Sequence, residues 1–321
     1  MKFIVTGGAG FIGSCIVRLL NDIGYSDIII VDNIASTEKW KNISNKSFCE
    51  YLHKDRLFEI LPSLKDVTHI IHMGACSSTT EKNFDYLYRN NFDYSRRLWE
   101  YCTKEGLSFI YASSAATYGD GSLGFSDNIE IKNLLPLNGY GYSKQIFDLW
   151  AEKQVDKPKQ YVGMKFFNVY GPNEYFKGTM ASVIYHAYNS VINKGKIQLF
   201  RSYKKEYADG EQKRDFLYIK DLCNIVKYFI SRPDISGLFN IGTGKAETFN
   251  RLAESVFKAL DMTHNIEYIE MPESIRSKYQ YYTAADIKKL RLVGYGNRFY
   301  DLENGAEDYI KNYLEKEFLV Y

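Results

Sequence analysis

A glycine-rich turn close to the N-terminus is the feature that most constrains this chain. Gly7, Gly10 and Gly13 follow a strand-like segment, residues 2–6, and the next apolar strand ends in Asp32. Gly7 permits the tight turn, Gly10 lets the backbone approach a pyrophosphate, and Gly13 lets the following helix pack against the sheet. Free N–H groups at the helix start favour phosphate, and an acid about 20 residues further on can reach an adenosine ribose. The pattern predicts a dinucleotide-binding site, with an ordinary tight turn as the alternative.

The composition limits the classes of function. The chain has 321 residues, of which 45% are hydrophobic and 25% charged, as in ordinary globular proteins. A formal net charge of +2 indicates neither a nucleic acid nor a membrane surface as partner, and no apolar run approaches the ~20 residues of a membrane span. The N-terminus leads directly into a strand, so we expect no signal peptide. The five cysteines are scattered without a CxxC pair, which favours reduced thiols and a cytoplasmic protein over a disulfide framework or a zinc site.

A metal site built from histidines is not expected either. The most suggestive pair, His69 and His72, brackets the end of an expected strand. Side chains alternate between the two faces of a strand, so residues three apart point to opposite sides.

The first half of the chain alternates strands and helices. Strands are expected at Lys2–Thr6, Ile28–Asp32, Val67–His72, Ser108–Ala112 and Tyr161–Phe167. The helices between them include Phe11–Leu20, Tyr86–Tyr101 and Tyr142–Lys153. Such alternation, with apolar strands, predicts an α/β fold with a Rossmann-type, doubly wound parallel sheet covered on both faces. Ligands then bind at the carboxyl ends of the strands, where the strand order reverses.

A smaller C-terminal, substrate-binding lobe is expected after residue 171. The dinucleotide-binding domain would comprise residues 1–171 with a returning segment at about 215–245, and the lobe would comprise residues 172–214 and 246–321. Helices are expected at Ala181–Asn193, Phe249–Leu260 and Asp301–Leu314, a polar loop at Tyr203–Lys213, and short strand pieces in Asp215–Leu222 and Leu238–Ile241.

A second motif, Tyr140-Gly-Tyr-Ser-Lys144, carries the chemistry. Four residues apart on a helix, Tyr140 and Lys144 share one face, whereas Tyr142 faces elsewhere. A free tyrosine has a pKa near 10, and a neighbouring ammonium favours the phenolate and lowers that pKa. The pair could exchange a proton with a substrate hydroxyl while the lysine holds the nicotinamide ribose. The alternative is a chance occurrence in a chain with 28 tyrosines.

Two strand-end segments complete this site. Ser114 follows the strand 108–112, where its hydroxyl can bond a reacting oxygen and assist proton transfer. The small residues after Met73 follow the strand that ends at His72, and would let the backbone approach a cofactor. Each segment could instead be a plain turn.

Further motifs are distinctive in order and composition. They are residues 74–80 (Gly-Ala-Cys-Ser-Ser-Thr-Thr), 111–119 (Tyr-Ala-Ser-Ser-Ala-Ala-Thr-Tyr-Gly), 167–172 (Phe-Asn-Val-Tyr-Gly-Pro), 177–182 (Lys-Gly-Thr-Met-Ala-Ser), 214–216 (Arg-Asp-Phe) and 239–244 (Phe-Asn-Ile-Gly-Thr-Gly). Over nearly its whole length the chain resembles the extended short-chain dehydrogenase/reductases. Among them it is most similar to the ADP-L-glycero-D-manno-heptose 6-epimerase family of bacterial lipopolysaccharide-core synthesis.

This resemblance implies a redox epimerisation of ADP-D-glycero-β-D-manno-heptose to its L-glycero isomer. Hydride would leave C6, a 6-ketone would turn in the site, and the hydride would return to the opposite face. Two faces call for two proton-handling groups: Tyr140 would serve one, and Lys177 matches the family's second acid/base. Burial in a cleft can lower a lysine's pKa. A diphosphate contact or a solvated loop lysine is the alternative role for Lys177.

The motifs and the resemblance together assign the remaining residues. The expected catalytic residues are Tyr140, Lys144, Lys177 and Ser114. The expected cofactor-binding residues are Gly7, Gly10, Phe11, Ile12, Gly13, Asp32, Asn33, Lys39, Lys54, Met73, Gly74, Ala75, Cys76, Ser77, Asn91, Tyr140, Lys144, Val169 and Lys177. The expected substrate-binding residues are Ser114, Asn168, Thr179, His186, Phe200, Arg201, Ser202, Arg214 and Tyr279. An ion pair for Arg214, a helix-face role for His186 and core packing for Tyr279 are alternatives.

The resemblance also bears on cofactor and assembly. Asp32 by itself favours NAD because it repels a 2′-phosphate, but the family mainly uses NADP, with Asn33 and lysines matched by Lys39 and Lys54. NADP is therefore expected, with NAD as the alternative, and a homo-oligomer, often a pentamer, is implied. Met73 departs from the polar residue expected there, and the charged loop 203–213 looks longer than usual.

Three other functions remain open. A 4,6-dehydratase would need an acidic pair after the catalytic serine, but this chain has Ala115-Ala116-Thr117. A 4-epimerase would not need Lys177. A non-catalytic dinucleotide-binding protein could have lost Tyr140, Lys144 or Ser114, and all three are present.

Overall fold

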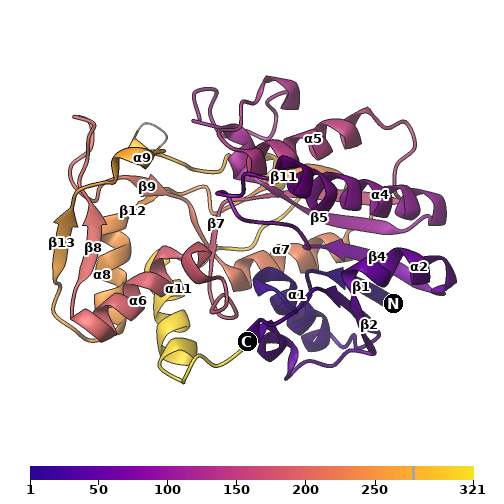
Figure 1. The fold of residues 1–321 in the computed structure, drawn as a ribbon, viewed down its shortest axis with the longest axis horizontal. Coiled ribbons are helices and arrows are strands. Elements are labelled where there is room, and N and C mark those ends of the chain that lie inside the picture. Colours follow the sequence, from indigo (N-terminus) through magenta and orange to yellow (C-terminus); the bar gives the residue numbers. More distant parts are fainter. Residues whose placement is uncertain (277–278) are drawn as a thin grey trace.

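The computed structural model describes residues 1–276 and 279–321 and is organised around a seven-stranded parallel sheet (Figure 1). The strand order is β11-β6-β5-β4-β1-β2-β3, so the order reverses between β1 and β4. The strands are β1 (Lys2–Thr6), β2 (Ile28–Asp32), β3 (Glu50–His53), β4 (Val67–His72), β5 (Ser108–Ser114), β6 (Gln160–Phe166) and β11 (Gly237–Ile241). The predicted Rossmann-type fold is confirmed.

Helices cover both faces of the sheet because its strands are apolar on both sides. Alternate residues of β1 show this: Phe3 and Val5 belong to the core under α1 (Phe11–Asp22) and α7 (Ile219–Ser231). Ile4, between them, packs in the core under α4 (Tyr94–Glu105) and α5 (Gly139–Lys153). Figure 1 shows α4 and α5 on one side of the sheet and α1 and α7 on the other.

The lobe at the left of Figure 1 is built from the later part of the chain. Its elements are α6 (Val183–Lys194), β8 (Ile197–Phe200), β9 (Lys213–Arg214), β12 (Glu247–Thr248), α8 (Phe249–Ala259), β13 (Ile266–Ile269), α9 (Glu273–Arg276) and α11 (Leu302–Tyr309). β8 pairs with β13 in parallel, and β9 pairs with β12 antiparallel. A separate parallel pair, β7 (Asn168–Tyr170) with β10 (Phe216–Tyr218), leads from the sheet into the lobe.

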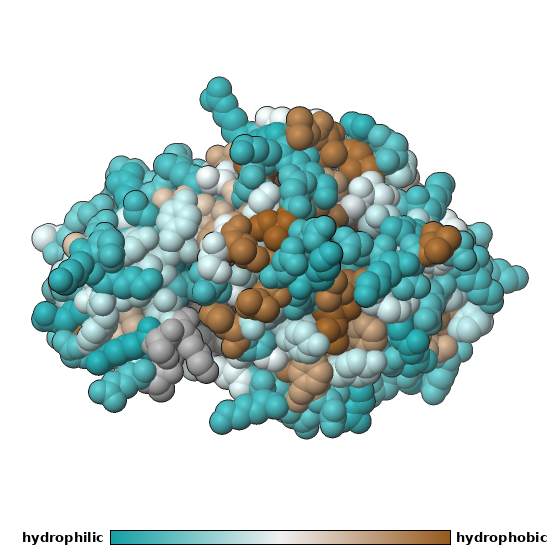
Figure 2. All heavy atoms as spheres, turned by 90° about the horizontal axis from the view of Figure 1, so that it is seen from above, coloured by the Kyte–Doolittle hydropathy of each residue, from teal (hydrophilic) through white to brown (hydrophobic). Residues whose placement is uncertain are grey.

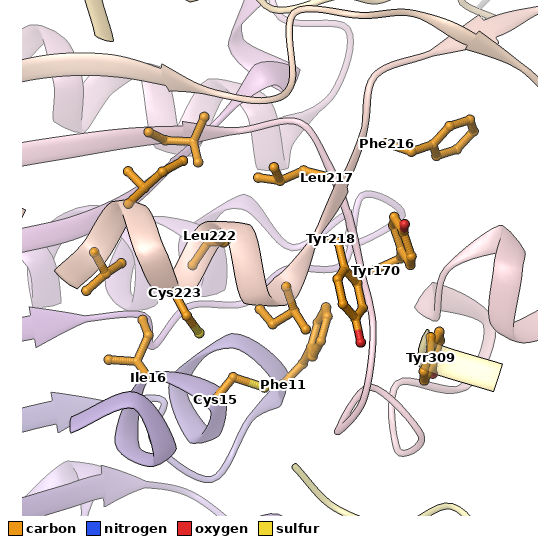
Figure 3. Close-up of a cluster of buried hydrophobic side chains, with 14 of the residues drawn as sticks. Phe11, Cys15, Ile16, Tyr170, Phe216, Leu217, Tyr218, Leu222, Cys223 and Tyr309 are labelled. Carbon is orange, nitrogen blue, oxygen red and sulfur yellow. The ribbon is translucent and has the colours of Figure 1, made fainter. Parts of the chain in front are cut away.

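One buried cluster joins the sheet to the lobe. Figure 3 shows Cys15 of α1 facing Cys223 of α7, with Tyr170 and Tyr218 continuing the cluster toward Tyr309 of the lobe. Because the apolar core is continuous across this junction, α1, which starts at the glycine turn, is packed against elements that lead to the lobe. The two-part division of the chain stays a prediction.

The remaining helices are short. They are α2 (Leu57–Ile60), α3 (Phe84–Leu87) and α10 (Lys288–Leu292), with 3-10 turns at Glu38–Ile43, Lys54–Arg56, Leu61–Ser63, Ala115–Tyr118, Ile131–Asn133 and Gly178–Met180, and π-helical turns at Tyr88–Asp93 and Ile310–Leu314. In the part of the chain that the structure describes, no helix has the length and apolar character needed to cross a membrane. Seen from above, the surface carries hydrophobic side chains in separate groups among hydrophilic ones (Figure 2).

The largest correction to the predicted elements concerns residues 215–222. Short strand pieces were expected throughout, but β10 ends at Tyr218 and the 13-residue helix α7 begins at Ile219. Ile219, Leu222 and Val226 recur at helical spacing and are all buried, so the apolar stripe of a helix decides this segment. β3 was also missed, and the expected helix 86–101 is interrupted by the π-helical turn at Tyr88–Asp93.

Candidate active site

The glycine turn has the close approaches that its sequence predicts. Gly7 has φ of +65°, a conformation that side chains disfavour, and a Cβ there would lie 2.6 Å from the amide nitrogen of Gly74. A Cβ on Gly13 would lie 2.1 Å from the carbonyl oxygen of Gly7. Gly10, at the N-cap of α1, has no side chain to cap the helix, so the first N–H groups of α1 are open to an anion.

A cleft of about 800 Å³ opens at the carboxyl ends of the strands, beside this turn. It brings together most of the predicted residues from both halves of the chain. Those that line it are Gly7, Gly10, Phe11, Ile12, Gly13, Asp32, Asn33, Lys39, Lys54, Met73, Gly74, Ala75, Cys76, Ser77, Ser114, Tyr140, Lys144, Asn168, Val169 and Lys177. Open helix N–H groups, glycines that admit no Cβ and a carboxylate at the cleft's edge fit a dinucleotide.

Asp32 lies at the end of β2 with both oxygens engaged. Oδ2 accepts from the backbone N–H of Ala9, at 2.9 Å, so the carboxylate also holds the glycine turn. Oδ1 accepts from the N–H of Asn33 at 2.7 Å and from Nζ of Lys39 at 2.8 Å. The predicted compensation of Asp32 by Lys39 is therefore present as an ion pair. Lys54 also lines the cleft, but its Nζ donates to Oδ1 of Asn90 at 2.8 Å.

The first turn of α5 places Tyr140 beside Ser114, the last residue of β5. Oδ1 of Asn138 accepts from the N–H of Gly141 at 2.8 Å and caps this helix. A Cβ on Gly141 would lie 2.7 Å from the carbonyl oxygen of Ala116, so this glycine allows α5 to approach the end of β5. The contact was not foreseen, because it depends on residues 25 positions apart in the sequence.

The electrostatics of this pair differ from the sequence-based expectation. Burial raises the pKa of the Tyr140 phenol, and the Ser114 hydroxyl lowers it in part. Lys144 was expected to lower it, but its Nζ donates to the carbonyl oxygen of Ala112 at 2.9 Å. Burial lowers the pKa of Lys144 to about 8, which is close to physiological pH.

Lys177 reaches the cleft from a loop between β7 and α6. Its Nζ lies 5.3 Å from the centre of the Phe11 ring, at the start of α1. Burial lowers the pKa of Lys177, as predicted for a cleft lysine, while Glu174 raises it. Glu174 is fully buried and accepts from Gly171 N at 3.2 Å, from Ser182 N at 2.6 Å and from Ser182 Oγ at 2.7 Å. These bonds close the loop that carries Lys177.

Several predicted residues do not line the cleft. Asn91 lies behind it, where its side chain accepts from Cys76 N at 2.8 Å and donates to Cys76 O at 2.9 Å, so it holds the cofactor loop from the rear. Thr179 is exposed beside Lys177, and His186 is exposed on α6.

Of the other predicted substrate residues, Tyr279 and Phe200 lie near Arg214 in the lobe. Its guanidinium carbon lies 5.3 Å from the Tyr279 ring and 5.6 Å from the Phe249 ring, and one nitrogen donates to Lys213 O at 2.8 Å. Burial lowers the pKa of Arg214, and among the described residues no carboxylate lies within ion-pair distance of it. Phe200 packs edge-on against Tyr279 with ring centres 6.2 Å apart. Arg201 and Ser202 continue the chain from Phe200, and Arg201 pairs with Glu270 at 3.6 Å.

Some lining residues were missed by sequence analysis. They include Asn42, Asn90, Tyr94, Ser113, Phe176 and Met180. Asn42 is the most informative, because its Nδ2 donates both to Ala9 O in the glycine turn, at 3.0 Å, and to Asn173 O in the Lys177 loop, at 3.1 Å. No local motif marks it, since its two partners are 33 and 131 residues away.

A family model described as the NAD dependent epimerase/dehydratase family matches residues 3–242. The chain belongs to this family. The ADP-L-glycero-D-manno-heptose-6-epimerase of Fusobacterium nucleatum is 48% identical and that of Nitratidesulfovibrio vulgaris (strain DP4) is 51% identical, with 98% and 97% of this chain and 98% of each relative covered. The resemblance that the motifs indicated is thus confirmed over nearly the whole chain.

Solved structures share the fold of this chain. The crystal structure of the Helicobacter pylori ADP-L-glycero-D-manno-heptose-6-epimerase has a TM-score of 0.81 and 27% identity, and covers 97% of this chain and 95% of its own. A structure of MoeE5 with UDP-glucuronic acid and NAD, 23% identical with a TM-score of 0.78, shares the fold. Because the matching family is described as NAD dependent, a nicotinamide dinucleotide is the cofactor class of this member.

Two of the five histidines, His69 and His72, are engaged in the core. His72 hydrogen-bonds Thr6 Oγ1 at 2.6 Å and Ser95 Oγ at 2.9 Å, and burial lowers its pKa to about 3. His69 stacks on Phe3 with ring centres 4.9 Å apart. Within residues 1–276 and 279–321, no group of three or more His, Cys, Asp or Glu side chains is placed to hold a metal ion.

Proposed function

We propose that this protein epimerises ADP-D-glycero-β-D-manno-heptose at C6 to the L-glycero isomer, through a 6-ketone and with bound NADP. One observation carries the proposal: a single cleft receives Ser114, Tyr140 and Lys144 from the sheet side and Lys177 from the lobe side. The family's chemistry needs proton-handling groups for two faces of one carbon. The names of the relatives support the heptose substrate.

The dinucleotide would be held by the glycine turn and the open start of α1 at its diphosphate, and by Asp32 and Lys39 at its adenosine ribose. Lys144 would hold the nicotinamide ribose. When bound, the nicotinamide supplies the hydride acceptor and donor. The chain's own residues bind it, orient the sugar and move protons at O6.

Tyr140 would exchange a proton with O6 on one face of C6, with Ser114 donating a hydrogen bond to the same oxygen. Lys177, on the lobe side, would handle the proton on O6 when the ketone presents its other face. The depressed pKa of Lys177 lets it exchange a proton nearer neutral pH than a free lysine does. Arg214, a half-buried arginine, would bind the substrate diphosphate through two parallel donors.

NADP is proposed over NAD because Lys39 pairs with Asp32 at 2.8 Å and offsets the charge that would repel a 2′-phosphate. Lys54 supplies a second cation at this end of the cleft. Affinities of the purified protein for NADP⁺ and NAD⁺, measured by calorimetry, test this choice. Tighter binding of NAD⁺ would reverse it.

The function is tested by incubating the purified protein with ADP-D-glycero-β-D-manno-heptose, without added cofactor, and following C6 by NMR. Conversion to the L-glycero isomer supports the epimerase and a retained, self-regenerated cofactor. No conversion, even with NADP and NAD supplied, contradicts the proposal and favours another sugar-nucleotide epimerase or dehydratase of the family.

We further infer a cytoplasmic homo-oligomer, pentameric by family resemblance. Exposed apolar side chains such as Leu135, Val155 and Leu292, which are 75%, 94% and 86% exposed, give surfaces that could be covered in an assembly. Light scattering at several protein concentrations measures the mass, and a monomer at all of them would contradict this inference.

A further inference from the structure

A buried carboxylate lies beneath the proposed catalytic residues. Asp148 stands on α5 one helical turn after Lys144 and is 2% exposed. Its Oδ1 accepts from the Tyr111 hydroxyl at 3.1 Å, and its Oδ2 accepts from the Ser113 hydroxyl at 2.6 Å. A buried carboxylate is unfavourable unless such donors and nearby cations compensate it. Apolar packing alone would not favour a carboxylate at this buried position.

Asp148 ties together the two elements that carry the reacting groups. β5 ends in Ser114, and α5 carries both Tyr140 and Lys144. The two hydroxyls that bind Asp148 come from β5, three and one residues before Ser114. Between them, Ala112 O accepts from Nζ of Lys144 at 2.9 Å. Hydrogen bonds from β5 hydroxyls to Asp148 and from Lys144 to Ala112 O thus join β5 and α5 next to Ser114 and Tyr140.

Asp148 is also the acid that faces Lys144. The other titratable groups around Lys144 are Cys76, on the loop after β4, and His72, on β4. His72 stays neutral because burial lowers its pKa to about 3. Asp148 raises the pKa of Lys144 against the effect of burial. Among the described residues, Asp148 is therefore the one carboxylate that favours the protonated form of Lys144.

The pKa of Asp148 is raised by burial, and a second lysine opposes part of that shift. Lys165, on β6, is 1% exposed, and with the hydroxyls of Ser113 and Tyr111 it lowers the pKa of Asp148, which burial raises. Nζ of Lys165 donates to Thr117 Oγ1 at 3.0 Å. The other charged groups around Lys165 are Asp127, Lys289 and Glu152.

We propose that Asp148 is a positioning residue for the reaction proposed above: its carboxylate clamps β5 to α5 and supplies the counter-charge that holds Lys144 as an ammonium beside Tyr140. It touches neither substrate nor cofactor and acts through Lys144 and Ser113. The inference rests on the proposed function, because it gives Lys144 its role from that mechanism. Its distinguishing consequence is a change in the pH dependence of turnover, which a packing role would not produce.

The test compares Asp148→Asn with Glu152→Gln, which makes the same change from carboxylate to amide at an exposed position one turn further along α5. In Asp148→Asn we expect kcat at pH 7.5 to fall about 10- to 100-fold and its alkaline limb to move down by about one pH unit, with KM for the sugar nucleotide unchanged within about twofold. Glu152→Gln should match the wild type. Affinity for reduced dinucleotide, measured by nicotinamide fluorescence, should begin to fall at lower pH in Asp148→Asn only.

An unmoved alkaline limb in a folded Asp148→Asn protein overturns the proposal. If that variant fails to fold, Ser113→Ala provides the test, because it keeps the carboxylate and removes the 2.6 Å hydrogen bond that lowers its pKa. The acid limb of kcat should then move to higher pH, and an unchanged limb overturns the proposal. Absence of turnover in the wild type would instead contradict the proposed function.

Discussion

Two lysines line one cleft, one carried by a helix and the other by a loop. Lys144 stands within the 15-residue helix α5, packed against the sheet, whereas Lys177 stands in a loop between β7 and α6. Burial lowers the pKa of both, and each faces a buried carboxylate, Asp148 for Lys144 and Glu174 for Lys177. The same electrostatic arrangement is therefore built on a helix in one half of the protein and on a loop in the other.

The difference lies in what the carboxylates bind. Asp148 accepts from side-chain hydroxyls of β5 and so fixes a helix to a strand. Glu174 accepts mainly from backbone N–H groups at both ends of the Lys177 loop and so fixes the shape of that loop. Lys144 is therefore held by a helix fixed to the sheet, whereas Lys177 is held by a loop whose two ends are joined through Glu174. The following predictions test this comparison.

The largest effect is expected at Tyr140, on the helix-borne side. Tyr140→Phe removes the phenolic proton carrier without changing the ring, so kcat should fall about 10³-fold or more, at the upper part of the range for general acid–base groups. Tyr142→Phe, on the exposed face of the same helix, is the matched control and should retain turnover. NMR of C6 configuration provides the measurement, and intact turnover in Tyr140→Phe would refute the mechanism.

Lys177→Met should lower epimerisation about 10²-fold or more while the dinucleotide stays bound, because the loop lysine is assigned to the proton and not to the cofactor ribose. The readouts are turnover and the absorbance of dinucleotide that copurifies. Lys194→Met, at the end of α6, changes an exposed lysine of the same lobe and should be silent. Unchanged turnover in Lys177→Met would show that the loop lysine has only a structural role. It would then not be a functional counterpart of Lys144.

Arg214→Met should act on binding. A half-buried guanidinium that binds a diphosphate contributes on the order of 2–3 kcal/mol through charge-assisted hydrogen bonds, so KM should rise about 30- to 160-fold with a smaller change in kcat. Steady-state kinetics separates the two constants. Arg298→Met, at an exposed arginine, is the control. A fall in kcat alone would argue that Arg214 does not bind substrate.

The pH profile distinguishes the two lysines directly. The pKa of Lys144 is lowered to about 8, so its ammonium is present below that pH and is lost as pH rises through it. Dinucleotide affinity should therefore be constant below about pH 8 and fall by up to about tenfold per pH unit above it, in the wild type and in Lys177→Met alike. If Lys177→Met loses this pH dependence, Lys177 and not Lys144 is the lysine whose titration causes it.

The smallest effect is expected at the far end of the cleft. Lys39→Met leaves Asp32 without its ion pair, so affinity for NADP⁺ should fall several-fold relative to NAD⁺, within the range for partly exposed charge pairs. Lys41→Met, two residues on and paired with Glu38 at the surface, should leave the ratio unchanged. Calorimetric titration of both dinucleotides measures the ratio, and an equal loss for both would count against a 2′-phosphate contact.

Much of the dinucleotide half could be predicted because its signals are local. The bounds of β1, β2 and β4 follow from short apolar runs, and the turn at Gly7–Gly13 follows from steric needs of neighbouring residues. The start of α7 was missed because β10 leads into it without a break, and the choice between strand and helix there depended on which side chains could be buried.

The sequence by itself determined the fold class, from the alternation of strands and helices, and the cofactor class, from the glycine turn, and it predicted that Tyr140 and Lys144 share one helix. Only the tertiary structure decided that Asn42 joins the glycine turn to the Lys177 loop, that Arg214 lies half-buried near aromatic rings, and that Asp148 lies under Lys144 and between the hydroxyls of β5. Burial and long-range hydrogen bonds set the positions and surroundings of these groups, and both arise only when distant segments pack together.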